Sequence, residues 1–299
     1  MTTLSCRKKA QSVYRQRRPE KTVLFEVIKK HYKTWKRTRD DPVPQYVDKV
    51  FEGYLGCGIL AKGFACARCE ECRQDFLIAL SCKGRGICPS CNAMAMCETA
   101  ANLIENVIPR VAIRQFVISF PLRIRHYLQT HEILQAVLKI TVDEIRKRLI
   151  SCSPKAENPQ IGAVSFIQFF GNTLNVHPHF HILVADGIFT TEGEELLFHE
   201  ATLTPDDIAD TQDAIQKRVL KYFEKRSFFD HDTVEKMLSY ETSGFSLNAS
   251  VRIWANDRAG LERLLILMLL KNSDFQFCLL LMQLIFSMSL AYPEKGRRQ

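Results

Sequence analysis

Apolar residues recur at helical spacing near the start of the chain. Residues 1–55 are expected to be helical, because Val23, Val27 and Ile28 fall near one face of a segment whose other positions are largely basic or polar. Residues 57–97 lack this periodicity, except that residues 75–80 have the composition of a short strand. A further helix is predicted over residues 94–107. The first third of the chain therefore predicts helices around a small irregular module.

The pattern changes to strands in the second half. A helix is predicted over residues 205–226, because Thr204 precedes Pro205 and acidic residues follow in the first turn. One or two helices are predicted over residues 122–149. Apolar runs bounded by Pro, Gly, Asn or Asp predict strands at residues 114–120, 162–170, 177–185, 188–189 and 245–254. This order predicts an α+β fold in which helices pack against a largely antiparallel sheet.

The positive charge is concentrated at the N-terminus. The chain has a net charge of +8, whereas residues 1–50 hold 14 Lys and Arg against 5 Asp and Glu. A focused basic segment attracts a polyanion, and phosphate contacts are its usual use. The competing interpretation is a solvated basic helix that improves solubility. The candidate phosphate-binding residues are Lys8, Lys9, Arg15, Arg17 and Arg18.

Cysteines are clustered in the module that follows. The chain has 11 cysteines, and seven of them lie between Cys66 and Cys97. No apolar run resembling a signal peptide precedes them. Clustered thiols in a chain without an export signal indicate metal binding in a reducing cytoplasm rather than disulfides.

Two pairs of these cysteines have the spacing of a zinc site. Cys69 and Cys72 form one CxxC pair, and Cys88 and Cys91 form a second pair after 15 intervening residues. Four thiolates complete a tetrahedron with no open position, which indicates a structural zinc ion. The alternative is a cluster of buried thiols without metal. Three other cysteines are near enough in sequence to replace a ligand or to build a second site: Cys66, Cys82 and Cys97.

Three histidines share one face of a predicted strand. Side chains at alternate positions project to the same side, so His177, His179 and His181 form a row with about 6 to 7 Å between neighbours. Such a row is suited to a divalent ion, Mg²⁺, Mn²⁺ or Zn²⁺, that polarises a phosphate oxygen. The alternative is a partly exposed face on which the histidines form ordinary hydrogen bonds.

At these residues the chain resembles a known family. The run Asn175-Val-His-Pro-His-Phe-His resembles the HUH motif (His, hydrophobic, His) of rolling-circle transposases of the insertion sequence 91 type. Residues 63–101, with the four paired cysteines, are similar to the zinc-binding domain of those transposases. Residues 114–125, 162–168, 244–247 and 257–264 are also similar. The resemblance covers roughly residues 20–265. Together with the charge and composition along the chain, it predicts four segments: a basic helical arm (1–55), a zinc-binding module (56–107), an antiparallel-sheet HUH endonuclease-like domain (108–264) and a hydrophobic tail (265–299).

The resemblance implies a DNA transposase in which a tyrosine attacks a phosphodiester and becomes linked to the 5′ end. It implies Mg²⁺ or Mn²⁺ at His179 and His181, with Phe180 in the core. His177 is the candidate third ligand, and Gln168 is a weaker one. The expected partner is DNA at the element ends, single-stranded or in a hairpin, with no membrane and no small-molecule substrate, in the cytoplasm.

The tail departs from the family. Leu267 stands near the place where relatives carry the nucleophilic tyrosine, and no tyrosine occurs between Tyr240 and Tyr292. Tyr222 is expected in the core, and Asn248 stands where relatives often have histidine. A truncated or frameshifted element, unable to complete the tyrosine chemistry, is therefore expected. Three alternatives stay open: a membrane helix over residues 275–292, a non-enzymatic DNA-binding protein, and a metal-dependent nuclease that uses water.

Overall fold

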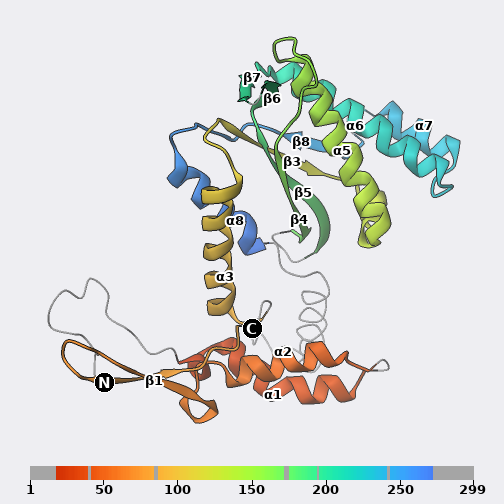
Figure 1. The fold of residues 1–299 in the computed structure, drawn as a ribbon. Helices are drawn as coiled ribbons and strands as arrows, with labels where there is room; N and C mark the ends of the chain where they lie inside the picture. Colours follow the sequence, from red (N-terminus) through yellow and green to blue (C-terminus); the bar gives the residue numbers. More distant parts are fainter. Residues whose placement is uncertain are drawn as a thin grey trace, which may run out of the picture. The chain divides into compact units, whose positions relative to one another are not determined.

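The computed structural model (Figure 1) describes residues 18–39, 42–83, 87–171, 175–193, 195–240 and 243–271. These residues divide into two compact units, and the division falls between Cys97 and Glu98 inside helix α3 (Pro89–Asn102). Within the described ranges no helix is both long and apolar enough to cross a membrane. The expected segment 275–292 lies outside these ranges.

The first unit begins with two helices that share an aromatic core. It contains η1 (Pro19–Lys21), α1 (Val23–Arg37), α2 (Gln45–Gly56), η2 (Leu60–Lys62), β1 (Phe64–Arg68), β2 (Asp75–Ala79) and the first part of α3. The prediction of helices before residue 56 is confirmed over the described residues. Of the predicted apolar face, Ile28 is buried and Val27 is half-buried, and only Val23 is misplaced. Val23 is 77% exposed, whereas α1 buries Phe25, Ile28, Tyr32 and Trp35, because these larger side chains recur at three- and four-residue steps.

The same core includes cysteines. Tyr32 stacks on Phe51 of α2 with ring centroids 4.0 Å apart. The cluster continues through Tyr54 to Cys57 and Cys88, so the helices expected to form a separate arm share one core with the cysteine-rich segment.

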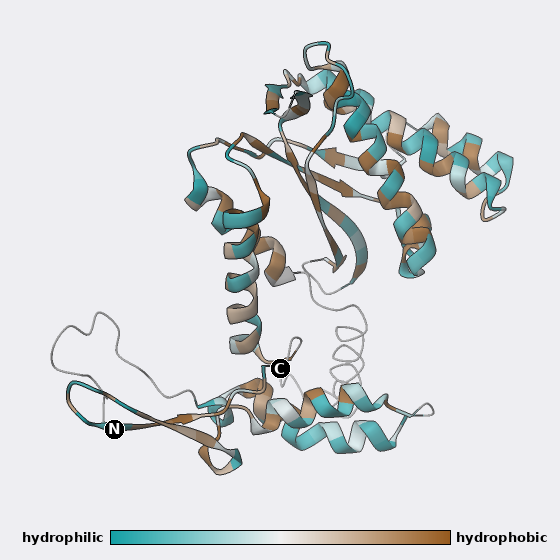
Figure 2. Cartoon of the chain, viewed as in Figure 1, coloured by the Kyte–Doolittle hydropathy of each residue, from teal (hydrophilic) through white to brown (hydrophobic). Residues whose placement is uncertain are grey.

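The cysteine-rich segment contains a two-stranded hairpin. Strand β2 confirms the strand expected over residues 75–80, and β1, which was not predicted, pairs with it antiparallel from Phe64↔Ala79 to Arg68↔Asp75. Figure 2 shows this hairpin as largely hydrophobic, although Phe64 and Leu77 are about half exposed. A lone hairpin is marginally stable in water, so this one depends on what holds its ends.

The second unit is built on an antiparallel sheet. Its strands are β3 (Ile113–Ser119), β4 (Ala163–Phe170), β5 (Val176–Ala185), β8 (Ser246–Asn248) and β9 (Arg252–Ile253). The order is β4-β5-β3-β8, and β9 also pairs with β3. A separate hairpin joins β6 (Gly187–Glu192) to β7 (Glu195–Glu200). The α+β prediction is confirmed, while the single strand expected over residues 245–254 is split into β8 and β9.

Helices cover both faces of this sheet. The helical segments are η3 (Leu103–Val107), α4 (Leu122–Arg125), η4 (Tyr127–Gln129), α5 (His131–Ser151), α6 (Pro205–Lys225), α7 (His231–Ser239), which was not predicted, and α8 (Arg258–Lys271). Phe180 and Ile182 of β5 lie in a core with α5 and α6. Leu183 points the other way, into a second core with Leu261 and Leu265 of α8. Strand β5 is therefore the centre of a helix–sheet–helix arrangement.

A buried carboxylate fixes one end of the sheet. Asp186, fully buried after β5, accepts hydrogen bonds from Arg114 Nε at 2.7 Å and from Arg252 Nε at 2.6 Å. These arginines come from β3 and β9, so one carboxylate joins three strands. A buried carboxylate is strongly destabilising when its partners are removed.

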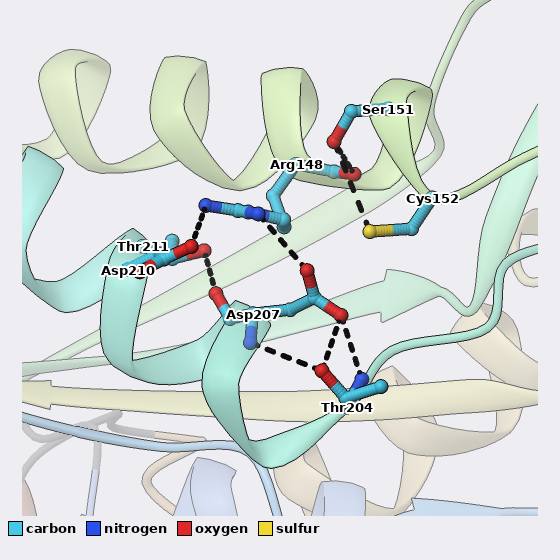
Figure 3. A network of polar contacts seen from close by, with 7 residues as sticks. All are labelled: Arg148, Ser151, Cys152, Thr204, Asp207, Asp210 and Thr211. Atoms are coloured by element: carbon cyan, nitrogen blue, oxygen red, sulfur yellow. Dashed lines mark hydrogen bonds and ion pairs between the residues drawn. The ribbon is translucent and has the colours of Figure 1, made fainter.

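A capping box fixes the start of α6, as Figure 3 shows. Asp207 N–H donates to Thr204 Oγ1 at 3.2 Å, and Thr204 N–H donates to Asp207 Oδ2 at 2.9 Å. Arg148 of α5 donates to Asp207 Oδ1 at 2.9 Å. The Thr204 hydroxyl also donates to Asp207 Oδ2 at 2.6 Å, and this bond, followed by the one from Thr204 N–H, lowers the pKa of Asp207 to about 2. The cap therefore joins α5 to α6 and confirms the predicted helix start.

Replacing Asp207 with Asn is expected to lower the melting temperature by a few degrees at pH 7. The folded-state pKa lies below the ordinary aspartate value of 3.8, so the carboxylate stabilises the fold above that pH and loses this effect as the pH falls toward 2. Calorimetry from pH 7 to pH 2 measures the difference from wild type, which should close at the acid end. Asp206→Asn, in the same helical turn but outside the cap, is the matched control. An undiminished difference at pH 2 would contradict the assignment.

Candidate metal centres

Four thiols meet in the first unit: Cys57, Cys82, Cys88 and Cys91. Their sulfur atoms all lie within 4.8 Å of one another. The Sγ atoms are 3.7 Å apart for Cys57 and Cys88, 3.9 Å for Cys57 and Cys91, and 3.6 Å for Cys82 and Cys91. A tetrahedral zinc ion with Zn–S bonds of about 2.3 Å requires sulfur separations of about 3.8 Å. The cluster therefore has the dimensions of a four-thiolate zinc site.

The ligands come from three different elements. Cys57 follows the last turn of α2, Cys82 follows β2, and the Cys88 and Cys91 pair lies at the start of α3. Cys82 N–H donates to Cys57 Sγ at 3.3 Å, and Gly58 N–H donates to Leu80 O at 3.0 Å. These two bonds bring the end of the hairpin against the end of α2.

The structure brings together a different set of four thiols from the one expected. Cys88 and Cys91 are in the cluster, but Cys69 and Cys72 are not, because they lie in the turn that joins β1 to β2, at the far end of the hairpin from Cys82. Cys69 is half-buried and Cys72 is exposed. Cys82 occupies one of the two remaining positions in the cluster, and it was among the three cysteines named as possible replacements. Cys57 takes the other and was missed, because it has no CxxC partner and precedes the dense cysteine segment.

Thiol chemistry fits a cation at the cluster. Burial raises the pKa of the Cys91 thiol, and the neighbouring Cys88 raises it further. Zinc holds cysteine as thiolate, so a bound ion would deprotonate these groups and remove that penalty. All four positions are protein ligands, which makes the site structural rather than catalytic.

The histidine row lies on β5 of the second unit, on the face that α8 covers. The ring centroids are 5.4 Å apart for His177 and His179 and 5.1 Å apart for His179 and His181. Pairing with β4 changes register by one residue between Gln168 and Phe170, opposite Pro178, which has no N–H to donate. Phe180 points to the opposite face and is fully buried, as expected.

His179 and His181 are each oriented by a second polar group. His179 Nδ1 donates to the carbonyl of His177 at 2.7 Å, which directs Nε2 toward Gln168 Oε1, 3.1 Å away. His181 Nδ1 lies 2.7 Å from the amide nitrogen of Gln115. Such bonds fix the ring orientation of metal-binding histidines. Gln115 was not expected, although it is the one polar residue between Arg114 and Ser119 in a strand of apolar residues.

His177 is suited to binding a cation through Nε2. This atom is buried and has no hydrogen-bond partner among the described residues. Burial lowers the pKa of His177, and the charge on Arg125 lowers it further. A neutral imidazole is the form that coordinates metals.

Helix α8 packs on the same face of the sheet, but residues 258–271 include no tyrosine. Gln168 Nε2 donates to Met268 O at 3.3 Å, so the Met268 backbone is one amide away from His179. Leu267, the position aligned with the nucleophile, is 54% exposed. Tyr222 packs against the core on the α5 side, as expected, and Tyr240 is exposed. Tyr292 lies outside the described residues.

Four of the five candidate phosphate-binding residues lie outside the described residues, namely Lys8, Lys9, Arg15 and Arg17. Arg18 is exposed and precedes η1, where its carbonyl accepts a hydrogen bond from Lys21 N–H at 3.1 Å.

Two family models match the chain. A transposase zinc-binding domain of the insertion sequence 91 type matches residues 27–120, which include the whole thiol cluster. A transposase family matches residues 162–266, which include the histidine row. No curated protein and no solved structure matches the chain significantly. The thiol cluster and the first match together identify a structural zinc site.

Replacing Cys57 or Cys82 with Ser is expected to release zinc from the purified protein, because each removes one of four thiolates and the ion contributes folding free energy. Cys69→Ser and Cys72→Ser, in the hairpin turn, are the matched controls and should retain zinc. Metal content by plasma mass spectrometry measures the result, with protease sensitivity as a second measurement. Zinc lost from the controls but kept by Cys57→Ser would return the ligand set to the two CxxC pairs.

Proposed function

Since the chain belongs to the transposase family of the insertion sequence 91 type, we propose that it binds the ends of its element and cuts one DNA strand at the histidine row. The observation that carries this proposal is the set of oriented imidazoles on β5, within the segment that the transposase family matches. A rolling-circle mechanism would use such a single-strand cut to produce a free 3′ hydroxyl.

We assign His179 and His181 as ligands of Mg²⁺ or Mn²⁺, with His177 as the candidate third ligand. When bound, such an ion polarises a phosphate oxygen and stabilises the charge that develops on it. The backbone carbonyl of His177 holds the His179 ring in place. Gln168 Oε1 must give up its hydrogen bond with His179 Nε2 before that nitrogen can bind a cation. The same oxygen can then serve as a further ligand.

The role of His181 depends on Gln115. An amide oxygen facing His181 accepts a hydrogen bond from Nδ1–H, and the lone pair of Nε2 can then coordinate a cation. An amide nitrogen there donates a hydrogen bond to Nδ1, which leaves the proton on Nε2. Rotation of the Gln115 amide by half a turn exchanges the two arrangements. Gln115 is 7% exposed, so it is held close to the ring in either state.

The described residues near the histidine row include no side chain suited to act as the nucleophile. Strand transfer requires an oxygen held in line at about 3 to 3.5 Å from phosphorus. No tyrosine occurs in α8, and Leu267 points into solvent. We therefore propose that this chain does not complete the tyrosine reaction. The absence of a phenol in α8 favours a second candidate function, in which the same histidines activate water for cleavage without a covalent intermediate.

DNA affinity is assigned to the basic residues before residue 20. Lys8, Lys9, Arg15, Arg17 and Arg18 carry the charge that would neutralise phosphates, and each released counterion makes binding weaker at higher salt. Single-stranded or hairpin ends are the proposed targets. The zinc site contributes stability and shape to this unit rather than chemistry.

Replacing both His179 and His181 with Ala is expected to abolish Mn²⁺ binding and to change DNA affinity by less than about threefold, because phosphate contacts are many and the ion is one. Calorimetry with Mn²⁺ and fluorescence anisotropy with DNA measure the two effects. His131→Ala, an exposed residue at the start of α5, is the control. Unchanged Mn²⁺ binding in the double variant would remove the metal site from β5.

No 5′-phosphotyrosyl adduct is expected with any oligonucleotide of the element, with Mg²⁺, Mn²⁺ or neither. Leu267→Tyr is expected not to create one, because this side chain is exposed rather than aimed at the histidine row. Denaturing gels of labelled substrate detect adducts and free nicks separately. Nicking without an adduct supports the water mechanism, whereas a DNA-linked peptide containing Tyr222, Tyr240 or Tyr292 would show an active tyrosine enzyme.

A further inference from the structure

A cavity of the second unit lies at the end of the sheet where β3 stops. It has a volume of about 560 Å³ and is formed by the start of α4, the end of α7 and the loop that precedes β8. Its lining includes Pro121, Leu122, Arg123, Lys236 and Tyr240. Volumes of this order accommodate small ligands. The family matches do not assign it a role.

The cavity lies at the same end of the sheet as His177 and His179, with α4 and α7 packed on the face that carries Phe180. Ser119, the last residue of β3, pairs with His179 of β5 on one side and with Ser246 of β8 on the other. Pro121 follows two residues later, about 7 Å further along the strand direction. Arg125 belongs to the same short helix α4 and acts on His177.

The chemistry of the lining matches a nucleotide. Leu122 is 77% exposed and Tyr240 is 69% exposed, so two large apolar surfaces stand open at the cavity. Two exposed cations, Arg123 and Lys236, come from separate helices and flank this apolar surface. Single-stranded DNA is bound by this combination, in which bases stack on aromatic rings and cations contact the backbone. Gly244 packs closely on Pro121. A Cβ at Gly244 would lie 3.1 Å from Pro121 Cβ, so a larger residue would crowd the cavity lining at this position.

We propose that this cavity holds one nucleotide of single-stranded DNA at the end of the sheet where the scissile phosphate is held, with the base against Tyr240 and the phosphate between Arg123 and Lys236. The inference rests on the proposed function, because it places the nucleotide relative to a cut at the histidine row. It also gives Tyr240 a role in binding, distinct from that of a nucleophile.

The test uses the full zinc-loaded chain and a fluorescein-labelled oligothymidylate of a dozen nucleotides, in buffer without added Mg²⁺ or Mn²⁺ so that binding does not depend on the histidine site. Tyr240→Ala is expected to weaken binding about tenfold, while Tyr240→Phe keeps the ring and should bind within about twofold of wild type. A second probe of the same length, made of abasic nucleotides, should bind wild type and Tyr240→Ala equally, because it offers no base to stack.

The cations are tested through salt dependence. Arg123→Ala and Lys236→Ala should each weaken binding and reduce the slope of log affinity against log salt by about 0.7, the value for one phosphate of a single strand. Lys155→Ala is the matched control. It is exposed and lies near Gln160, which pairs with Phe189 of β6, away from the end of β3.

The outcomes separate the two proposals. A wild-type chain that does not bind single-stranded DNA would overturn the proposed function and this inference with it. Normal binding by Tyr240→Ala and Lys236→Ala, with wild type bound, would overturn the cavity assignment alone. An equal loss on the abasic probe would show that Tyr240 does not stack a base. Circular dichroism melting verifies that each variant is folded. If Tyr240→Ala does not fold, Tyr240→Phe and Lys236→Ala still test the assignment.

Discussion

The two-residue period of β5, in a sheet covered on both faces, is the constraint on which the second unit depends. Phe180 and Ile182 must enter the core with α5 and α6, so His179 and His181 must face α8. On that side the imidazoles are partly shielded from water and need polar neighbours. A backbone carbonyl and the amides of Gln168 and Gln115 supply them. The packing that builds the core is thus the packing that orients the site.

The first unit reaches stability by another route. Its helices contribute a small aromatic core around Tyr32, Phe51 and Tyr54, which ends at the thiol cluster. Beyond the cluster the chain has little to bury, since the hairpin strands are largely exposed. A metal ion that joins the end of α2, the end of the hairpin and the start of α3 replaces the missing apolar contacts. The hairpin is then held at its base and left open at its tip.

Local patterns in the sequence were sufficient where the structure is local. The cap of α6 at Thr204, the strands β3 to β5 and the histidine row all follow from spacing along one element. The zinc ligands did not, because the CxxC rule measures separation within a turn, whereas Cys57 and Cys82 meet only when the hairpin folds back on α2. Gln115 was missed for the same reason, because only the register between β3 and β5 brings its side chain to His181. The buried face of α1 was set by its aromatic side chains rather than by valines.

Strand β3 pairs with partners made long after it. Its neighbours are β5 on one side and β8 and β9 on the other, and Asp186 joins Arg114 to Arg252 across that span. A ribosome adds about 5 to 20 residues per second, so roughly 7 to 28 s separate the synthesis of residues 114 and 252. During that interval the edge of β3 that pairs with β8 and β9 is open to pairing with another chain. The sheet that carries the histidines therefore closes late in synthesis, when β8 and β9 have been added.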